Sequence, residues 1–249
     1  SDVFEWAPDS SWLIVNTSAK RLLRLDVGRP GQAALIATDA VLSPGASVFR
    51  PPDGREIMFT RDSTGGLWTD DLDPATPPSL VIDNPEPENR DFRYARWSPD
   101  GTMIAFPATI GDGEQYRTFV AMADGSGIRR VSMAEGVWVE TDLRWSPDGS
   151  RIAFNHWQRQ GNGTWIIRPT GVVTVATGAV TNVGPPGVSD GTWMDWSPDG
   201  SYIIGVPGPL AAHGSVATGK ATITELATGT AAELPWRIQT QVSWQRLAS

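Results

Sequence analysis

Hydrophobic residues occur along the chain in short runs, and residues that favour turns separate these runs. Two clear examples, Met103–Phe106 and Arg151–Phe154, are rich in Ile and Phe and follow shortly after Ser-Pro-Asp-Gly. In that tetrapeptide proline fixes φ, aspartate binds the turn backbone, and glycine accepts a positive φ. Short apolar runs between such turns predict β-strands joined as hairpins, and no segment has the pattern of a strong helix.

The same segment recurs five times with a period close to 48 residues. Its shared aspartate is found at intervals of 44, 47, 48 and 51 residues, at Asp9, Asp53, Asp100, Asp148 and Asp199. A sixth, shorter copy places Trp244 48 residues after Trp196, close to the end of the chain. Two further strands fit around a second turn in each unit, such as 123–126 in the third. Four hairpin-connected strands per unit predict the blades of a β-propeller, whereas a β-sandwich would not repeat one segment at regular spacing.

The repeat also resembles a known family. Trp-Ser-Pro-Asp-Gly, an Ile-Ala-Phe strand and a later Ala-Asp-Gly-Ser turn are similar to the WD40-like (PD40) repeats of TolB-like propellers. The likeness covers nearly the whole chain and is weakest in the first two units, which carry Ala7 and Ser10, and Arg50 and Pro51, at motif positions.

The resemblance implies an all-β fold of four-stranded antiparallel blades in one propeller domain, 1–249. Five complete repeats predict blades at about 3–45, 46–92, 93–140, 141–191 and 192–241, with a closing strand at 242–249. We favour five blades. The alternative is the six-bladed ring usual for TolB-like proteins, with a sixth blade that this chain starts and does not finish.

Composition and charge narrow the classes of function. Gly 26 and Pro 20 among 249 residues argue against a helical bundle. A net charge of −8 and a pI near 4.8 speak against a nucleic-acid partner, and no apolar run is long enough for direct membrane insertion. The absence of cysteine excludes disulfides and thiolate chemistry. Because the chain begins with Ser1, we expect it to be a processed piece of a longer protein.

Aromatic and charged residues gather in the segments predicted to connect strands on one face of the propeller. Arg96, Arg144 and Asp195 directly precede the repeat tryptophans, so we expect them to line the central channel. Exposed aromatic side chains beside arginines and carboxylates favour a recognition surface; the alternative is that the tryptophans cap blade edges and the charges are solvated. The candidate ligand- or partner-binding residues are Arg93, Tyr94, Arg96, Trp138, Glu140, Arg144, His156, Trp157, Trp193 and Asp195.

Catalytic and metal sites have little support in the sequence. Residues 187–191 match the Gly-x-Ser-x-Gly nucleophile motif, but they lack its strand–turn–helix context, and only His156 and His213 are available as bases. The carboxylates of Asp70–Asp73 lack the spacing of an EF-hand loop. We therefore predict no enzyme activity and no cofactor; a channel Ca²⁺ held by Asp142 and Asp195 is not supported by their spacing.

We expect a non-catalytic propeller that binds a protein or peptide, as an interaction or sensory domain of an extracytoplasmic or membrane-anchored bacterial protein. The location is implied only by the family resemblance. The alternative is a carbohydrate-binding or carbohydrate-cleaving propeller that uses Trp138, Trp157 and Trp193 as stacking platforms. A third option is a propeller attached to a hydrolase or kinase. Convergence of these tryptophans with Arg93, Arg96, Arg144 and Glu140 around one pocket would favour the carbohydrate hypothesis.

Overall fold

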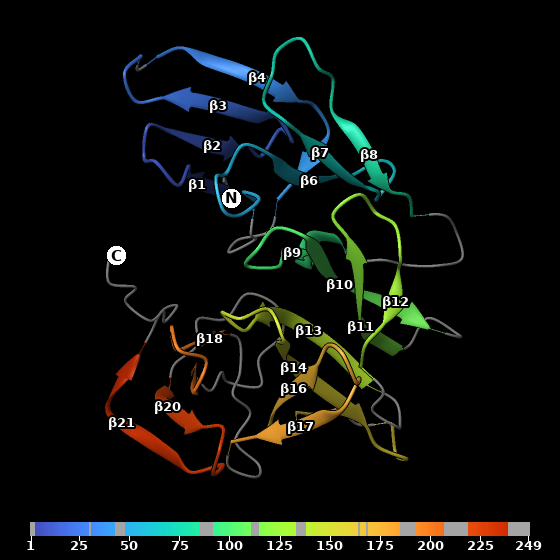
Figure 1. Ribbon diagram of the computed structural model, residues 1–249, viewed down its shortest axis with the longest axis vertical. Coiled ribbons are helices and arrows are strands. Elements are labelled where there is room, and N and C mark those ends of the chain that lie inside the picture. Colours follow the sequence, from blue (N-terminus) through green and yellow to red (C-terminus); the bar gives the residue numbers. More distant parts are fainter. Residues whose placement is uncertain are drawn as a thin grey trace. The chain divides into compact units, whose positions relative to one another are not determined.

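The computed structural model describes residues 3–29, 31–42, 48–84, 92–110, 115–132, 138–163, 165–167, 169–184, 193–206 and 219–238. Within these ranges all regular structure is β-strand, apart from one short 3₁₀ helix at Phe92–Tyr94 (Figure 1). The predicted all-β class is therefore confirmed. No helix in the described part of the chain is long and apolar enough to cross a membrane.

The strands follow the repeats, and we number the blades accordingly. Blade 1 contains β1 to β4, blade 2 β5 to β8, blade 3 β9 to β12, blade 4 β13 to β17, and blade 5 β18 to β21. In chain order the strands are Val3–Trp6, Trp12–Asn16, Leu22–Asp26, Ala33–Ala37, Ala40–Val41, Ile57–Arg61, Leu67–Asp70, Ser79–Ile82, Arg96–Trp97, Met103–Ile110, Gln115–Met122, Arg129–Arg130, Trp138–Trp145, Arg151–Arg159, Trp165–Ile167, Thr170–Thr174, Val180–Val183, Trp193–Trp196, Tyr202–Val206, Gly219–Glu225 and Ala231–Ile238.

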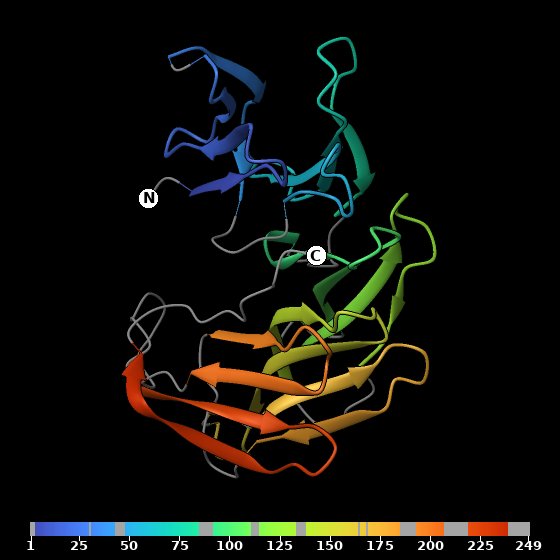
Figure 2. The same cartoon turned by 60° about the vertical axis from the view of Figure 1, so that its left-hand side comes forward.

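Blades 1, 2 and 5 are separate four-stranded sheets in which consecutive strands pair antiparallel. Blade 5 is the orange and red sheet in Figure 2. Strands of blades 3 and 4 form one nine-stranded sheet in the order β17-β16-β14-β13-β11-β10-β9, with β12 on β11 and β15 on β14. The two blades are joined by a parallel pairing of Tyr116 in β11 with Val139 in β13. The contacts divide the chain into two compact units, 1–109 with 119–129, and 110–118 with 130–249, and each is described by itself.

The Ser-Pro-Asp-Gly turns have the chemistry predicted from the sequence. In blade 4, Ser146 Oγ donates to Asp148 Oδ1 (2.6 Å), and the backbone N–H of Ser150 donates to the same carboxylate (3.0 Å). These hydrogen bonds lower the pKa of Asp148 to about 2. The backbone N–H of Gly149 donates to the carbonyl of Ser146 (2.9 Å), which closes the turn. Equivalent bonds connect Ser98 with Asp100 and Ser197 with Asp199.

The hydrophobic core lies between neighbouring blades. In the first unit, one cluster combines Trp12 and Ile14 of blade 1 with Phe49 and Phe59 of blade 2. The Trp12 and Phe49 rings meet edge to face, 5.1 Å apart. In the second unit, residues of blade 4 such as Val172 pack with Trp196 and other residues of blade 5. Because a single blade cannot bury both of its faces, each blade depends on its neighbours for stability.

Arginine side chains repeat one contact across two blade junctions. Arg50 of blade 2 places its guanidinium 5.2 Å from the centre of the Trp97 ring and donates to the carbonyl of Gly101 in blade 3 (2.8 Å). Arg151 of blade 4 lies 4.9 Å from the ring of Trp196 and donates to the carbonyl of Gly200 in blade 5 (2.9 Å). The two arginines occupy different positions of the repeat, so the same cation–π contact is made from two sequence positions.

Candidate functional site

The candidate residues fall into both units. Arg93, Tyr94 and Arg96 belong to the first unit, and the other seven belong to strands β13, β14 and β18 of the second. We predicted Trp138, Glu140, His156, Trp157 and Trp193 to lie in connecting loops, and that placement is wrong. Strands β13 and β14 continue through the first four: Trp138 pairs with Gln158, Val139 with Trp157, and Glu140 with His156. Trp193 begins strand β18 and pairs with Val206. The side chains of Arg93, Trp138, His156 and Trp193 lie outside the described part of the structure.

Glu140 is completely buried and is bound within the protein. Its Oε2 accepts hydrogen bonds from the backbone N–H of Thr118 (2.7 Å) and from Thr118 Oγ1 (2.8 Å), while Ser132 Oγ donates to Oε1. Burial raises the pKa of Glu140, and these bonds and the charge of Arg117 oppose the increase. Thr118 belongs to β11 of blade 3, so Glu140 connects blades 3 and 4. This carboxylate has an internal structural role and is not presented to a ligand.

Three charged residues lie on β13 of blade 4 and β18 of blade 5, and two of them, Asp142 and Arg144, lie at a β-bulge in β13. The register of β13 with β14 shifts between Thr141 and Arg144, and Asp142 adopts a φ of 54°. Bulges re-aim side chains and are over-represented beside functional sites. Burial lowers the pKa of Arg144, whereas the negative charges of Asp142 and Asp195 raise it. These partly exposed carboxylates and the guanidinium can form charge-assisted hydrogen bonds with a polar ligand.

The first unit contains a second charged pair, Glu5 and Arg96, which sequence reasoning recognised only in part. Burial raises the pKa of Glu5 to about 7, although the charge of Arg96 and a hydrogen bond from the backbone of Val48 oppose the increase. Glu5 directly precedes Trp6, the repeat position that Arg96, Arg144 and Asp195 occupy in their own blades. That shared position was the signal that would have identified Glu5 from the sequence.

We expect Glu5→Gln to remove a pH-dependent loss of stability. The folded-state pKa lies above the ordinary value of 4.5, so folding favours the neutral carboxyl. This stabilisation is fully present below pH 4.5 and is lost as the pH rises through about 7. Urea unfolding between pH 5 and 8.5 should show Glu5→Gln about 1–2 kcal/mol more stable than the wild type at the alkaline end. The same substitution at the exposed Glu233 is the control. The prediction would be contradicted if the free energy of unfolding of wild type and Glu5→Gln changed equally with pH.

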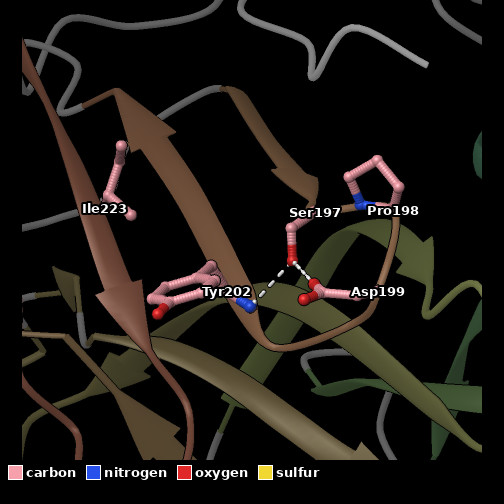
Figure 3. Close-up of a pocket in the computed structure, with 5 residues that line it drawn as sticks. All are labelled: Ser197, Pro198, Asp199, Tyr202 and Ile223. Atoms are coloured by element: carbon pink, nitrogen blue, oxygen red, sulfur yellow. Dashed lines mark hydrogen bonds between the residues drawn. The ribbon is translucent and has the colours of Figure 1, made fainter. Parts of the chain in front are cut away.

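An open surface hollow of about 430 Å³ lies at the turn of blade 5, and Ser197, Pro198, Asp199, Tyr202 and Ile223 line it (Figure 3). None of the ten candidate residues lines this hollow.

The described residues also contain no group of three or more His, Asp or Glu side chains that could hold a metal ion. In the run Asp70–Asp73 the carboxylates bind backbone, since Asp70 Oδ1 accepts from Leu72 N (2.6 Å) and Asp71 Oδ1 accepts from Asp73 N (3.0 Å). The Gly-x-Ser-x-Gly segment at 187–191 and His213 lie outside the described residues.

Solved structures with the same architecture are found for proteins of low sequence identity. TolB from Acinetobacter baumannii is 17% identical with a TM-score of 0.59, and the match covers 96% of this chain and 55% of that protein. A putative TolB from Agrobacterium tumefaciens is 19% identical with a TM-score of 0.60, covering 93% and 79% of the two chains. An oligogalacturonate lyase from Vibrio parahaemolyticus is 14% identical with a TM-score of 0.64, covering 93% and 64%.

These likenesses concern the fold. No family model matches the sequence, and no curated protein matches it. The chain spans about half the length of the Acinetobacter protein and less than two thirds of the lyase. The propeller fold predicted from the repeats is confirmed, while the predicted blade boundaries and blade number stay predictions.

Proposed function

We propose that this TolB-like propeller is a non-catalytic domain that binds a protein or peptide partner. The supporting observation is the elongated hairpin of blade 4. Strand β14 contains 9 residues, whereas the corresponding β2 of blade 1 and β6 of blade 2 contain 5 each. Strand β15 pairs with the far end of β14, beyond the part that pairs with β16. This extension gives blade 4 a surface that blades 1 and 2 do not have in their described strands.

Partly exposed Trp157 is the central residue of the proposed surface. It lies on the extension of β14, opposite Val139 on one side and Ile167 on the other. A tryptophan anchor near a bulged strand that carries Asp142 and Arg144 has the composition of a protein-recognition hot spot. The resemblance of the repeats to TolB-like propellers further supports a partner in an extracytoplasmic compartment, and we propose that location with the function.

The carbohydrate alternative has less support. It required Glu140 among the groups that surround a ligand, and this carboxylate is already bound by Thr118 and Ser132 in the interior. Arg96 is also buried. A fold likeness to an oligogalacturonate lyase at 14% identity keeps this alternative worth a direct assay. Purified protein incubated with oligogalacturonate, with and without Mn²⁺, should release no unsaturated product; product formation would overturn the non-catalytic proposal.

Trp157→Ala should weaken partner binding at least about tenfold, because removing a hot-spot anchor typically costs about 2 kcal/mol or more. A photo-crosslinking amino acid placed at position 157 identifies the partner in an envelope extract, and binding is then measured with the isolated partner. Leu35→Ala is the matched control, since Leu35 is an exposed hydrophobic residue in β4 of blade 1. Equal binding by Trp157→Ala and Leu35→Ala would contradict the proposed surface, and a crosslink formed only in cytosolic extract would contradict the location.

A further inference from the structure

The turn between β14 and β15 contains the only Asn-Gly pair in the sequence, Asn162 followed by Gly163. Residues 160–163 form a β-turn, since the backbone N–H of Gly163 donates to the carbonyl of Gln160 (2.9 Å). Gly161, Asn162 and Gly163 are all exposed. A Cβ placed on either glycine would meet no atom of the described residues within 4 Å beyond its chain neighbours. Both glycines of this turn therefore border open space.

An asparagine that precedes glycine readily loses its side-chain amide in water. The backbone nitrogen of the glycine attacks Cγ of the asparagine and forms a cyclic succinimide, while the Cγ–Nδ2 bond breaks. Ammonia leaves with the proton of the glycine N–H, and water then opens the ring at one of its two carbonyls. The products are aspartate and isoaspartate, in which the backbone runs through Cγ. Glycine favours this reaction because it has no Cβ to obstruct the approach of its nitrogen.

The Asp-Gly pair of a repeat turn can form the same succinimide, but the fold opposes it in two ways. A Cβ placed on Gly101 would lie 2.0 Å from the backbone oxygen of Pro51, so this turn has no room to rearrange. Loss of water from an aspartate also requires a neutral carboxyl. Hydrogen bonds from Ser98 and Thr102 lower the pKa of Asp100, so its carboxylate stays charged at neutral pH. The turn at Asn162 differs from this turn in its open surroundings and in its uncharged amide.

We propose that Asn162 is a site of spontaneous deamidation, at which the folded chain acquires aspartate and isoaspartate while the repeat turns stay unmodified. The reaction needs only water as a co-reactant. The bond from Gly163 to Gln160 has to open before the nitrogen can attack. Because this turn is exposed, water can replace that bond, and opening requires no movement of packed side chains.

The modification would change the extension of blade 4 that carries Trp157. Both products add a negative charge close to Arg159, the last residue of β14. Isoaspartate also adds a carbon atom to the backbone of the turn between the paired residues Arg159 and Trp165. Since loop length sets the register of a hairpin, the isoaspartyl form should pair less well with β15. The deamidation itself does not rest on the proposed function of this surface, and it is measured without a partner.

The test incubates the folded full chain at mildly alkaline pH and follows the chymotryptic peptide 158–165 by mass spectrometry. The deamidated fraction should grow at least about tenfold faster at Asn162 than at Asn182, which is also exposed but precedes the β-branched Val183. The rate should increase with pH, because the attacking nitrogen has to lose its proton. Asn162→Gln is the matched control, since it keeps the amide but would have to form a larger ring.

A methyltransferase specific for isoaspartate gives a second measurement, because it transfers a labelled methyl group to this product alone. Asn162→Gln should lose most of the label that the aged wild type takes up. In urea the protection of the repeat turns is removed, and the pair Asp100–Gly101 should then also be labelled. The proposal would be overturned if folded Asn162 deamidated no faster than Asn182, or if it reacted only in urea. Equal modification of Asp100 and Asn162 in the folded chain would overturn it as well.

Discussion

Replacing Gly101 with alanine should lower the free energy of unfolding by at least about 3 kcal/mol, although the change adds only one methyl group. Gly101 has a φ of +68°, and a Cβ placed there would lie 2.0 Å from the carbonyl oxygen of Pro51 in blade 2. The obstacle is backbone, so it cannot move aside as a flexible side chain would. The substitution therefore has to separate the turn of blade 3 from blade 2, and this disturbs the bond from Arg50 to the Gly101 carbonyl.

Gly229 provides a control that separates the two costs. Its φ of +69° matches that of Gly101, but a Cβ there would meet nothing within 4 Å. Gly229→Ala should cost only the strain of a left-handed backbone, about 1–2 kcal/mol. Urea unfolding of both variants at neutral pH measures the difference. If both glycines tolerate alanine equally well, blades 2 and 3 are not packed as closely as described.

The architecture was predictable because the repeat is a local signal. Ser-Pro-Asp-Gly fixes its turn with its own side chains, as the bonds from Ser98 and Thr102 to Asp100 illustrate. The adjoining apolar runs then form strands in any environment that buries them. Regular spacing of these turns was sufficient to predict four-stranded blades, and the structural likenesses confirm the fold.

The candidate site was harder to predict because its geometry depends on pairing between distant segments. Glu140 looked like a loop carboxylate, since the sequence does not show that Thr118 and Ser132 lie opposite it. The bulge at Asp142 also left no signal, because its flanking residues read as an ordinary strand. By contrast, Arg144 and Asp195 were recognised from their position before the repeat tryptophan, which is again a local feature.

The junctions between blades are built from different chemistry although the repeat is the same. Arg50 and Arg151 provide cation–π contacts at two junctions, whereas Glu140 connects blades 3 and 4 through hydrogen bonds. Different contacts at different junctions are expected in a repeat protein, because each contact stabilises only the two blades that it joins. A weaker contact at one junction can then be compensated by other contacts at the same junction. The buried carboxylate should be sensitive to substitution, because its hydrogen-bond partners Thr118 and Ser132 are themselves completely buried.

Glu140→Ala should therefore destabilise the protein by about 3–5 kcal/mol. The substitution leaves the Thr118 N–H, the Thr118 hydroxyl and the Ser132 hydroxyl without their acceptor, and it removes a negative charge that acts on buried Arg117. Glu140→Gln should cost less, about 1–2 kcal/mol, because the amide oxygen can still accept from Thr118 and the amide N–H can donate to Ser132.

Glu233→Ala is the control for the loss of a glutamate as such. Glu233 of β21 is exposed and forms an ion pair with Lys220, so its removal should lower the free energy of unfolding by less than about 1 kcal/mol.

Ser132→Ala tests whether Ser132 acts through Glu140. If Ser132 acts through Glu140, its substitution should have little further effect in the Glu140→Ala background, because the hydroxyl has already lost its acceptor. Additive effects of the two substitutions would mean that Ser132 stabilises the junction by another route. A Glu140→Ala variant as stable as Glu233→Ala would instead show that the connection between blades 3 and 4, which includes the strand pairing of Tyr116 with Val139, does not depend on the Glu140 hydrogen bonds.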